Sequence, residues 1–135
     1  MSFDGNNNYI DLGVNNDFMF QQQFSFECWV KLPDSGLTNS HGSIIGALDD
    51  YRINVYAGNG NNGACFVELP ELTPFYSAAT IVGSTDLRDN LWHHLALTYD
   101  GSQVVLYLDG MIDGSVNKNG NISSGISSEP FFIGK

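Results

Sequence analysis

Two apolar segments of strand length, one shortly after the other, constrain the fold of this chain most strongly. Residues 91–99 and 104–108 contain Leu, Val, Tyr and Thr, and an Asp-Gly pair follows each segment. Such side chains favour a pleated, half-buried surface. Asp-Gly supplies the positive φ that tight hairpin turns require. The two segments are therefore predicted to be consecutive antiparallel strands.

Strand-length segments recur along the whole chain, and no segment shows sustained helical periodicity. Turn-rich segments of Gly, Asn, Asp, Ser and Pro separate them, which is typical of an all-β sandwich or barrel. A chain of 135 residues fits one domain. We expect a single domain over 1–135, either a whole protein or a piece of a longer one. The predicted strands are 2–4, 9–13, 24–32, 43–48, 51–57, 64–69, 77–82, 91–99, 103–109, 111–116 and 130–134.

Alternation within 24–32 predicts which side chains reach the core. Phe24, Phe26, Cys28 and Val30 share one face, because successive strand residues point to opposite sides. Trp29 stands on the other, polar face, so we expect it to pack under a loop or to form part of a concave surface. The residues expected to carry the fold are Trp29, Trp92, Leu95, Leu97 and Leu106, and those expected to shape turns are Asp100, Gly101, Asp109 and Gly110.

Several motifs resemble those of laminin-G-like domains in the concanavalin A-type superfamily. Trp92-His93-His94 and the Tyr-x-Asp-Gly sequence at 107–110 resemble signatures of this family. The resemblance implies an all-β, two-sheet antiparallel jelly-roll sandwich and covers nearly the whole chain. Further similar segments follow in the family's order, at 2–5 with 9–13, 24–31, 43–46 and 131–134.

The chain departs from the family at its end. In the family, the Ile-Gly strand is normally followed by a closing strand that pairs near the N-terminal strand, whereas this chain stops at Lys135. A missing strand would expose a sheet edge, which natural proteins avoid. Three explanations stay open: a shortened chain, a strand donated by a second chain, or occupation of the vacancy by the N-terminal strand.

The acidic charge balance excludes several classes of partner. The chain has 5 basic and 15 acidic residues, a formal net charge of −10. Such a surface repels phosphate backbones, so we expect no nucleic acid partner. No apolar run approaches the ~20 residues of a membrane helix, so we expect no membrane insertion. Residues 1–4 show no signal-peptide pattern. The resemblance implies an extracellular or surface-exposed place, a virion surface included.

The cysteines and the paired histidines have structural interpretations. Cys28 and Cys65 lie inside apolar strands and are predicted to be buried free thiols. A disulfide stays open only if their strands adjoin. His93 and His94 point to opposite faces of a strand, so they do not bind one ion together. We expect one ring to hydrogen-bond across the sheet and the other to lie near the rim.

The carboxylates do not predict catalysis. Some concanavalin A-type sandwiches are glycosidases, which need two carboxylates that converge across a cleft. Glu27 is the one acid on its predicted strand, and Asp109 and Asp113 flank a hairpin, where we interpret both as turn residues. We therefore expect that the protein is not an enzyme.

Oxygen-rich and aromatic residues near predicted turns suggest two binding sites. Carboxylate and amide oxygens near the N-terminal turn suit Ca²⁺, and we predict Asp4, Asn6 and Asp11 as its ligands. An exposed aromatic ring beside Asn or Asp suits a sugar. Turn chemistry and core packing stay open as alternative roles for these residues. The predicted sugar-binding residues are Asp49, Asp50, Tyr51, Tyr56, Asn59, Asn61, Phe75 and Tyr76.

Two functions of different classes follow from these observations. The first is a non-catalytic recognition module that binds a glycan or a glycosylated protein surface, with or without Ca²⁺. The second is an architectural domain of a virion, an appendage or a multidomain surface protein. In that role a homo-oligomer or a strand-donating neighbour would complete the fold.

Overall fold

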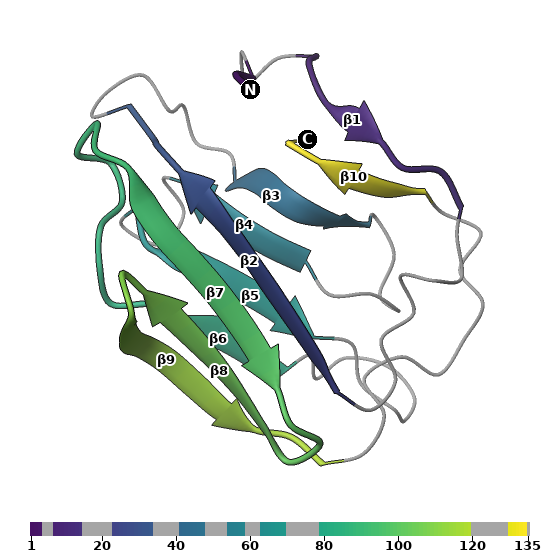
Figure 1. Ribbon diagram of the computed structural model, residues 1–135, viewed down its shortest axis with the longest axis vertical. Coiled ribbons are helices and arrows are strands. Elements are labelled where there is room, and N and C mark those ends of the chain that lie inside the picture. Colours follow the sequence, from purple (N-terminus) through teal and green to yellow (C-terminus); the bar gives the residue numbers. More distant parts are fainter. Residues whose placement is uncertain are drawn as a thin grey trace.

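The computed structural model describes residues 1–3, 7–14, 23–33, 41–47, 54–58, 63–69, 79–119 and 130–134. These residues form ten strands and no helix (Figure 1). None of them belongs to a helix that is long and apolar enough to cross a bilayer. The strands are β1 (Ile10–Asp11), β2 (Phe24–Val30), β3 (His41–Ala47), β4 (Asn54–Gly58), β5 (Cys65–Leu69), β6 (Ala79–Val82), β7 (His93–Tyr99), β8 (Gln103–Leu108), β9 (Met111–Asn117) and β10 (Phe131–Ile133).

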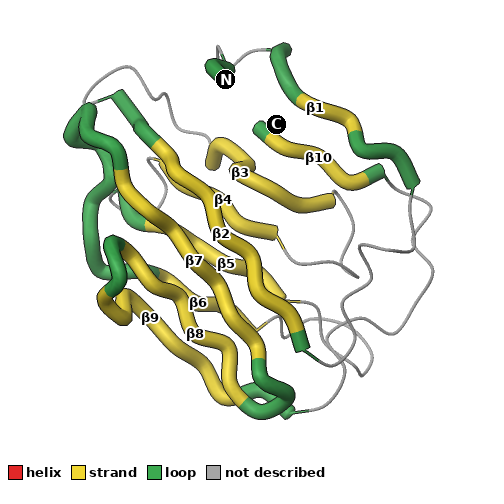
Figure 2. Tube along the Cα trace, in the orientation of Figure 1, coloured by secondary structure: helices red, strands yellow, loops and turns green. Residues whose placement is uncertain are grey.

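The strands form two antiparallel sheets that lie face to face. One sheet has the order β1-β10-β3-β4-β5-β6, and the other has the order β2-β7-β8-β9. The four-stranded sheet lies in front in Figure 2, with β1 and β10 of the other sheet beyond β2. The predicted all-β, two-sheet antiparallel sandwich is confirmed.

The core lies between the two sheets. Leu95, Leu97 and Leu106 of the four-stranded sheet are completely buried, as are Cys65 and Val67 of β5. This burial confirms the predicted core role of the three leucines. The apolar side chains of β2 pack against the same cluster but are half-buried. The burial of core side chains therefore decreases toward β2, which is an edge strand of its sheet.

Asp113 joins the two sheets at the edge where β6 and β9 meet. A register shift in β9, opposite Leu106 and Tyr107, precedes Gly114. The Asp113 carboxylate accepts hydrogen bonds from the Ser84 amide (3.1 Å) and hydroxyl (2.9 Å), and from the Thr85 hydroxyl (2.9 Å). Its interpretation as a turn residue is thus wrong, because the bulged strand carries it to the loop after β6.

The turn predictions on either side of β8 are confirmed. Asp100 Oδ1 accepts hydrogen bonds from the Ser102 amide and the Gln103 amide, each at 2.8 Å. Gly101 adopts φ +100°, and Asp109 and Gly110 adopt φ +50° and +80°. These left-handed residues let β7, β8 and β9 follow one another as hairpins.

The predicted strand at 2–4 is wrong at Ser2 and Phe3, which belong to no strand, while Asp4 lies outside the described residues. The Phe3 ring lies against Gly134, where a Cβ atom would approach it to 2.6 Å. Tyr9 packs edge-on against Phe132 at 5.3 Å between centroids. Phe3 and Tyr9 therefore contact β10 through their side chains, whereas Ile10 and Asp11 pair with it as β1 and backbone hydrogen bonds to Phe131 continue at Leu12 and Gly13.

Candidate functional site

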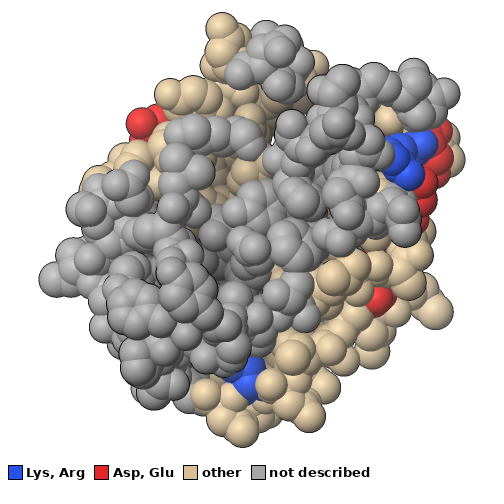
Figure 3. Space-filling model, turned by 180° about the vertical axis from the view of Figure 1, so that it is seen from behind, with Lys and Arg blue, Asp and Glu red and all other residues tan. Residues whose placement is uncertain are grey.

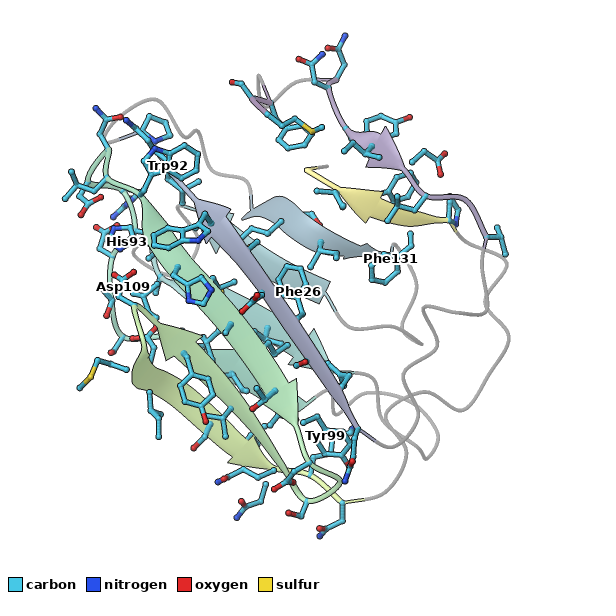
Figure 4. The ribbon with its side chains drawn as sticks, viewed as in Figure 1. Phe26, Trp92, His93, Tyr99, Asp109 and Phe131 are labelled. Atoms are coloured by element: carbon cyan, nitrogen blue, oxygen red, sulfur yellow. The ribbon has the colours of Figure 1, made fainter. Side chains whose placement is uncertain are left out.

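The Trp-His-His segment places three consecutive residues in three different environments. Trp92 precedes β7 and is 59% exposed at the rim of the sandwich. His93 begins β7 and lies beside Asp109, as the labelled side chains in Figure 4 show. His94 lies on the outer face of the four-stranded sheet, opposite Trp29. Strand alternation, which separates His93 from His94, accounts for this division.

His93 lies between two carboxylates. Its Nδ1 is 2.7 Å from Asp109 Oδ2, and its Nε2 is 3.1 Å from Asp89 Oδ1. Asp109 Oδ1 also accepts the His94 amide at 2.8 Å, and Asp89 Oδ1 accepts the Leu91 amide at 2.9 Å. The contact with Asp109 raises the pKa of His93, and Asp89 adds to this shift. We call His93, Asp89 and Asp109 the histidine clasp.

The geometry of the histidine clasp is that of a structural contact. Both ring nitrogens of His93 face carboxylates of the same chain, so neither nitrogen is available to a substrate. The contact with His93 lowers the pKa of Asp109, which favours its ionised, hydrogen-bond-accepting form. Among the described residues, no three His, Cys, Asp or Glu side chains are grouped to hold a metal ion. The expectation that one histidine hydrogen-bonds across the sheet is therefore confirmed.

The outer face of the four-stranded sheet carries an exposed aromatic cluster. Trp29 of β2 pairs across the strands with His94 of β7, and the ring centroids are 5.2 Å apart at 50°. His94 Nε2 lies 3.5 Å from Glu27 Oε2. Trp29 remains 63% exposed. The expectation that Trp29 carries the fold is therefore wrong, and the same applies to Trp92 at 59%.

Small and aromatic neighbours extend this cluster across the sheet. Glu27 pairs with Ala96, and Ala96 pairs with Tyr107 of β8. The small side chain of Ala96, a single methyl group, therefore lies between the larger side chains of Glu27 and Tyr107. We call Trp29, Glu27, His94, Ala96 and Tyr107 the outer-face platform. It offers an aromatic ring, a carboxylate and an imidazole to solvent, and these groups can contact one apolar face and the hydroxyls of a sugar.

The predicted sugar-binding residues lie outside the described residues, with one partial exception. The exception is Tyr56, whose backbone in β4 pairs with Ser43 and Phe66. Because β4 and β5 are antiparallel, the start of β4 lies beside the end of β5, and the end of β4 lies beside the start of β5. The remaining residues are Asp49, Asp50, Tyr51, Asn59, Asn61, Phe75 and Tyr76, and their role stays a prediction.

The predicted calcium ligands do not form a site among the described residues. Asp4 and Asn6 lie outside them, and Asp11 is exposed in β1. Asp11 Oδ1 accepts the Gly13 amide at 2.7 Å, which is an Asx-type turn contact. One carboxylate engaged in a turn is far from the six to eight oxygens that Ca²⁺ takes. The described part of the chain therefore supplies no calcium cage.

Both cysteines are free thiols, as predicted, but only Cys65 is buried; the prediction of a buried thiol is wrong for Cys28, which is half-buried because it lies on the edge strand β2. Cys28 and Cys65 are free, in strands of opposite sheets. In the part of the face that Figure 3 describes, basic atoms are scattered rather than gathered into a patch. Arg88 is engaged by Asp86 (Nη2 to Oδ2, 2.8 Å), whose pKa this pairing holds at about 2, and Lys118 is buried.

These features define a class: a two-sheet antiparallel sandwich of the jelly-roll type. The sequence matches the family described as the Concanavalin A-like lectin/glucanases superfamily over residues 4–135. The chain belongs to this superfamily. A comparison with curated protein sequences found no match.

The chain is similar to several solved structures. One is Ruminococcus gnavus IT-sialidase CBM40, with a TM-score of 0.61 and 15% identity, covering 87% of this chain and 65% of that one. Another is the heptameric SAP-like pentraxin from Limulus polyphemus, with a TM-score of 0.49 and 14% identity, covering 93% of this chain and 62% of that one. This chain spans less than two thirds of each structure, and at these identities the likeness concerns the fold alone.

Proposed function

We propose that this domain is a non-catalytic recognition module that binds glycans through the outer-face platform. The observation that carries the proposal is the position of Trp29. It lies within a regular seven-residue strand and beside His94, whose ring is tilted by 50° to the indole, yet Trp29 remains 63% exposed. An exposed aromatic with hydrogen-bonding neighbours is a typical recognition surface rather than a packing element.

Membership of a lectin and glucanase superfamily supports binding of carbohydrate or of a glycosylated protein. The contacts of four carboxylates support binding without catalysis, because each of them lies against another group of the protein. Asp89 and Asp109 contact His93, Asp113 contacts the loop after β6, and Glu27 lies beside His94. The fold relation to a glycan-binding module also favours an extracellular or surface-exposed place for the domain.

The two tryptophans allow a direct test, because they are the only two in the chain. In the Trp92→Phe variant, fluorescence reports on Trp29 alone. In the Trp29→Phe variant, it reports on Trp92 alone. We expect glycans from a neutral oligosaccharide panel to change the emission of the first variant and not of the second. A change confined to the second would move the site to the rim and overturn the proposal.

The affinity of Trp29→Ala completes this test. Truncation of a tryptophan that anchors an interface costs more than ~1 kcal/mol, so we expect a loss of about fivefold or more in glycan affinity. Met111→Ala is the control, since Met111 is also a largely exposed apolar residue (74%, against 63% for Trp29) on β9, at the other edge of the sheet. Equal affinities of both variants would contradict the proposed site.

A second candidate function is assembly by strand addition, and the edge of β2 favours it. β2 pairs with β7 on one side, and no described strand pairs with its other side. Its inward residues Phe26 and Cys28 are half-buried, whereas their neighbours on β7, Leu97 and Leu95, are fully buried. An added strand would cover this edge and complete the core. An obligate oligomer in light scattering, with no glycan binding, would favour this function over the first.

Binding of Ca²⁺ is a further proposal, and light scattering and glycan titration also test it. Asp4, Asn6 and Asp11 are its predicted ligands. Light scattering and glycan titration with and without a chelator would decide it. A loss of binding or a change of mass on chelation supports a calcium site, and identical results under both conditions exclude calcium from the function.

A further inference from the structure

A row of paired side chains crosses the whole outer face of the four-stranded sheet. Cross-strand partners point to the same face, so the strand register shows how the surface beside Trp29 continues. The row runs from β2 to β9 and consists of Glu27, Ala96, Tyr107 and Ile112, each paired with the next. Tyr107 is half-buried, and Ile112 is 67% exposed. The surface that begins at Trp29 on one edge strand therefore reaches the other edge strand.

Trp29 and Tyr107 are too far apart for one sugar to cover both. Two strand spacings separate β2 from β8, and Trp29 lies two residues beyond Glu27, which begins the row. In an ideal sheet these steps place the Cα atoms of Trp29 and Tyr107 roughly 12 Å apart. A sugar ring has about the size of an aromatic ring and stacks on only one of them. On β7 the row has only the methyl group of Ala96, which keeps it shallow between its two ends.

The charges on this face favour neither sign of ligand. Glu27 lies two residues before Trp29 and Lys31 lies two residues after it, and both are exposed on the same face. Among the described residues, no carboxylate forms an ion pair with Lys31. A carboxylate accepts hydrogen bonds and an ammonium group donates them, whereas a hydroxyl does both. Opposite charges on the two sides of the indole therefore suit a neutral sugar with several hydroxyls.

We infer that the outer-face platform binds an extended, neutral, β-linked glycan chain that lies across the strands, with one sugar on Trp29 and a later sugar on Tyr107. This inference rests on the proposed glycan-binding function and specifies its ligand as the interior of a chain rather than a terminal sugar. β-linked chains form flat ribbons, which fit a shallow row of side chains. Ile112 would contact the chain beyond Tyr107. Each added sugar covers more of the row, so affinity should rise with chain length.

Oligosaccharides of graded length test this inference. The probes are three neutral, β-linked series, derived from cellulose, xylan and mannan, each from the disaccharide to the hexasaccharide. They are titrated into the Trp92→Phe protein, with Trp29 emission as the readout. In at least one series the hexasaccharide should bind about fivefold or more tightly than the disaccharide, as for the gain of one further anchor. Longer chains also offer more binding registers, so variants must assign the gain to the row.

The variants are compared by the ratio of hexasaccharide affinity to disaccharide affinity. Tyr107→Ala should lower this ratio about threefold or more, and Tyr107→Phe, which keeps the ring, should lower it less. Ile112→Ala changes an exposed position and should also lower the ratio, which keeps the test decisive if Tyr107→Ala does not fold. Met111→Ala is the matched control, because Met111 pairs with the core residue Leu108 and so belongs to the other face. An unchanged ratio in Tyr107→Ala and Ile112→Ala, or an equal fall in Met111→Ala, would overturn the inference.

The outcomes also separate this inference from the function on which it rests. Equal affinity for the disaccharide and the hexasaccharide of every series, with both lost in Trp29→Ala, would overturn the extended chain and leave the glycan site at Trp29 intact. Binding of none of the three series would also overturn the extended chain, while the wider neutral panel would decide the proposed function independently. Loss of binding when the terminal sugars of a chain are chemically blocked would assign the site to chain ends and refute the inference directly.

Discussion

His93 Nδ1 lies 2.7 Å from Asp109 Oδ2 and ties the first residue of β7 to the turn between β8 and β9. The imidazole side chain is only 12% exposed, so water does not readily replace its partners. His93→Ala should therefore destabilise the fold by about 1–3 kcal/mol. Urea unfolding measures this change, with the exposed neighbour Trp92→Ala as control. Equal midpoints for the two variants would contradict the structural role of the histidine clasp.

The histidine clasp should make stability depend on pH in two opposite directions. Hydrogen bonding to Asp109 raises the pKa of His93 above its ordinary 6.5 in the folded state. Its contribution is therefore complete below that value and is lost as the pH rises through the folded-state pKa. The pKa of Asp109, and that of Asp89, lie below the ordinary 3.8, so their contributions are lost on acidification through the folded-state values.

We expect the clasp to contribute most between these two ranges, in mildly acidic solution. Thermal unfolding of the wild type and of His93→Gln across pH measures the difference. The stability gap between the two proteins should narrow above neutral pH and again in strong acid. A gap that is constant with pH would show that the ion pairs make no contribution.

Gly83→Ala should be destabilising because of Asp113. A Cβ atom at Gly83 would collide with Asp113 Oδ2, a buried atom with no hydrogen-bond partner among the described residues. Overpacking of this kind typically costs 1–3 kcal/mol. A double-mutant cycle with Asp113→Ala tests the cause, since removing the carboxylate should relieve most of the added cost. Additive effects would place the strain elsewhere.

The two faces of the four-stranded sheet should respond very differently to truncation. Leu97→Ala removes a completely buried side chain and should cost about 2–5 kcal/mol. Trp29→Ala removes a larger but exposed side chain and should change the free energy of unfolding far less. Chemical denaturation of both variants gives the comparison. A larger loss for Trp29→Ala would mean that the indole is covered in the folded protein.

Cys28 should be chemically inert in the native state. Burial raises the pKa of its thiol to about 11, so little reactive thiolate forms at neutral pH. Cys65 is completely buried. A thiol reagent should therefore label the native protein slowly at both positions and the denatured protein quickly at both. Fast labelling of one thiol without denaturant would contradict this prediction.

Periodicity and turn chemistry predicted most of the fold. The alternation of Phe24 with Ser25 and of Leu95 with Ala96 gave the inward faces of β2 and β7 correctly. Asp-Gly pairs located both turns that flank β8. These signals are local, so one sequence is enough to detect them. The failed strand at Ser2 and Phe3 shows the limit of such signals, since packing of Phe3 on Gly134 depends on a contact across the whole chain.

The candidate site was less accessible to prediction. Alternation placed Trp29 on the polar face, but whether a side chain is covered depends on distant segments, and both tryptophans proved exposed. The partners of His93 were also missed, because Asp89 and Asp109 approach it only once the hairpins have formed. Glu27 on the same face as Trp29 was a signal in the sequence. Its pairing with His94 required the register of β2 and β7.

The contact of Asp113 with Ser84 and Thr85 has a consequence for motion within the sandwich. It fixes the sheets to each other where β6 meets β9. We therefore expect any movement of the two sheets away from each other to be smallest at the edge where β6 meets β9 and to increase across β8 and β7 toward β2. The amide protons of β2 should accordingly exchange with solvent before those of β7 and β8, so that the surface that carries Trp29 lies on a strand that opens early.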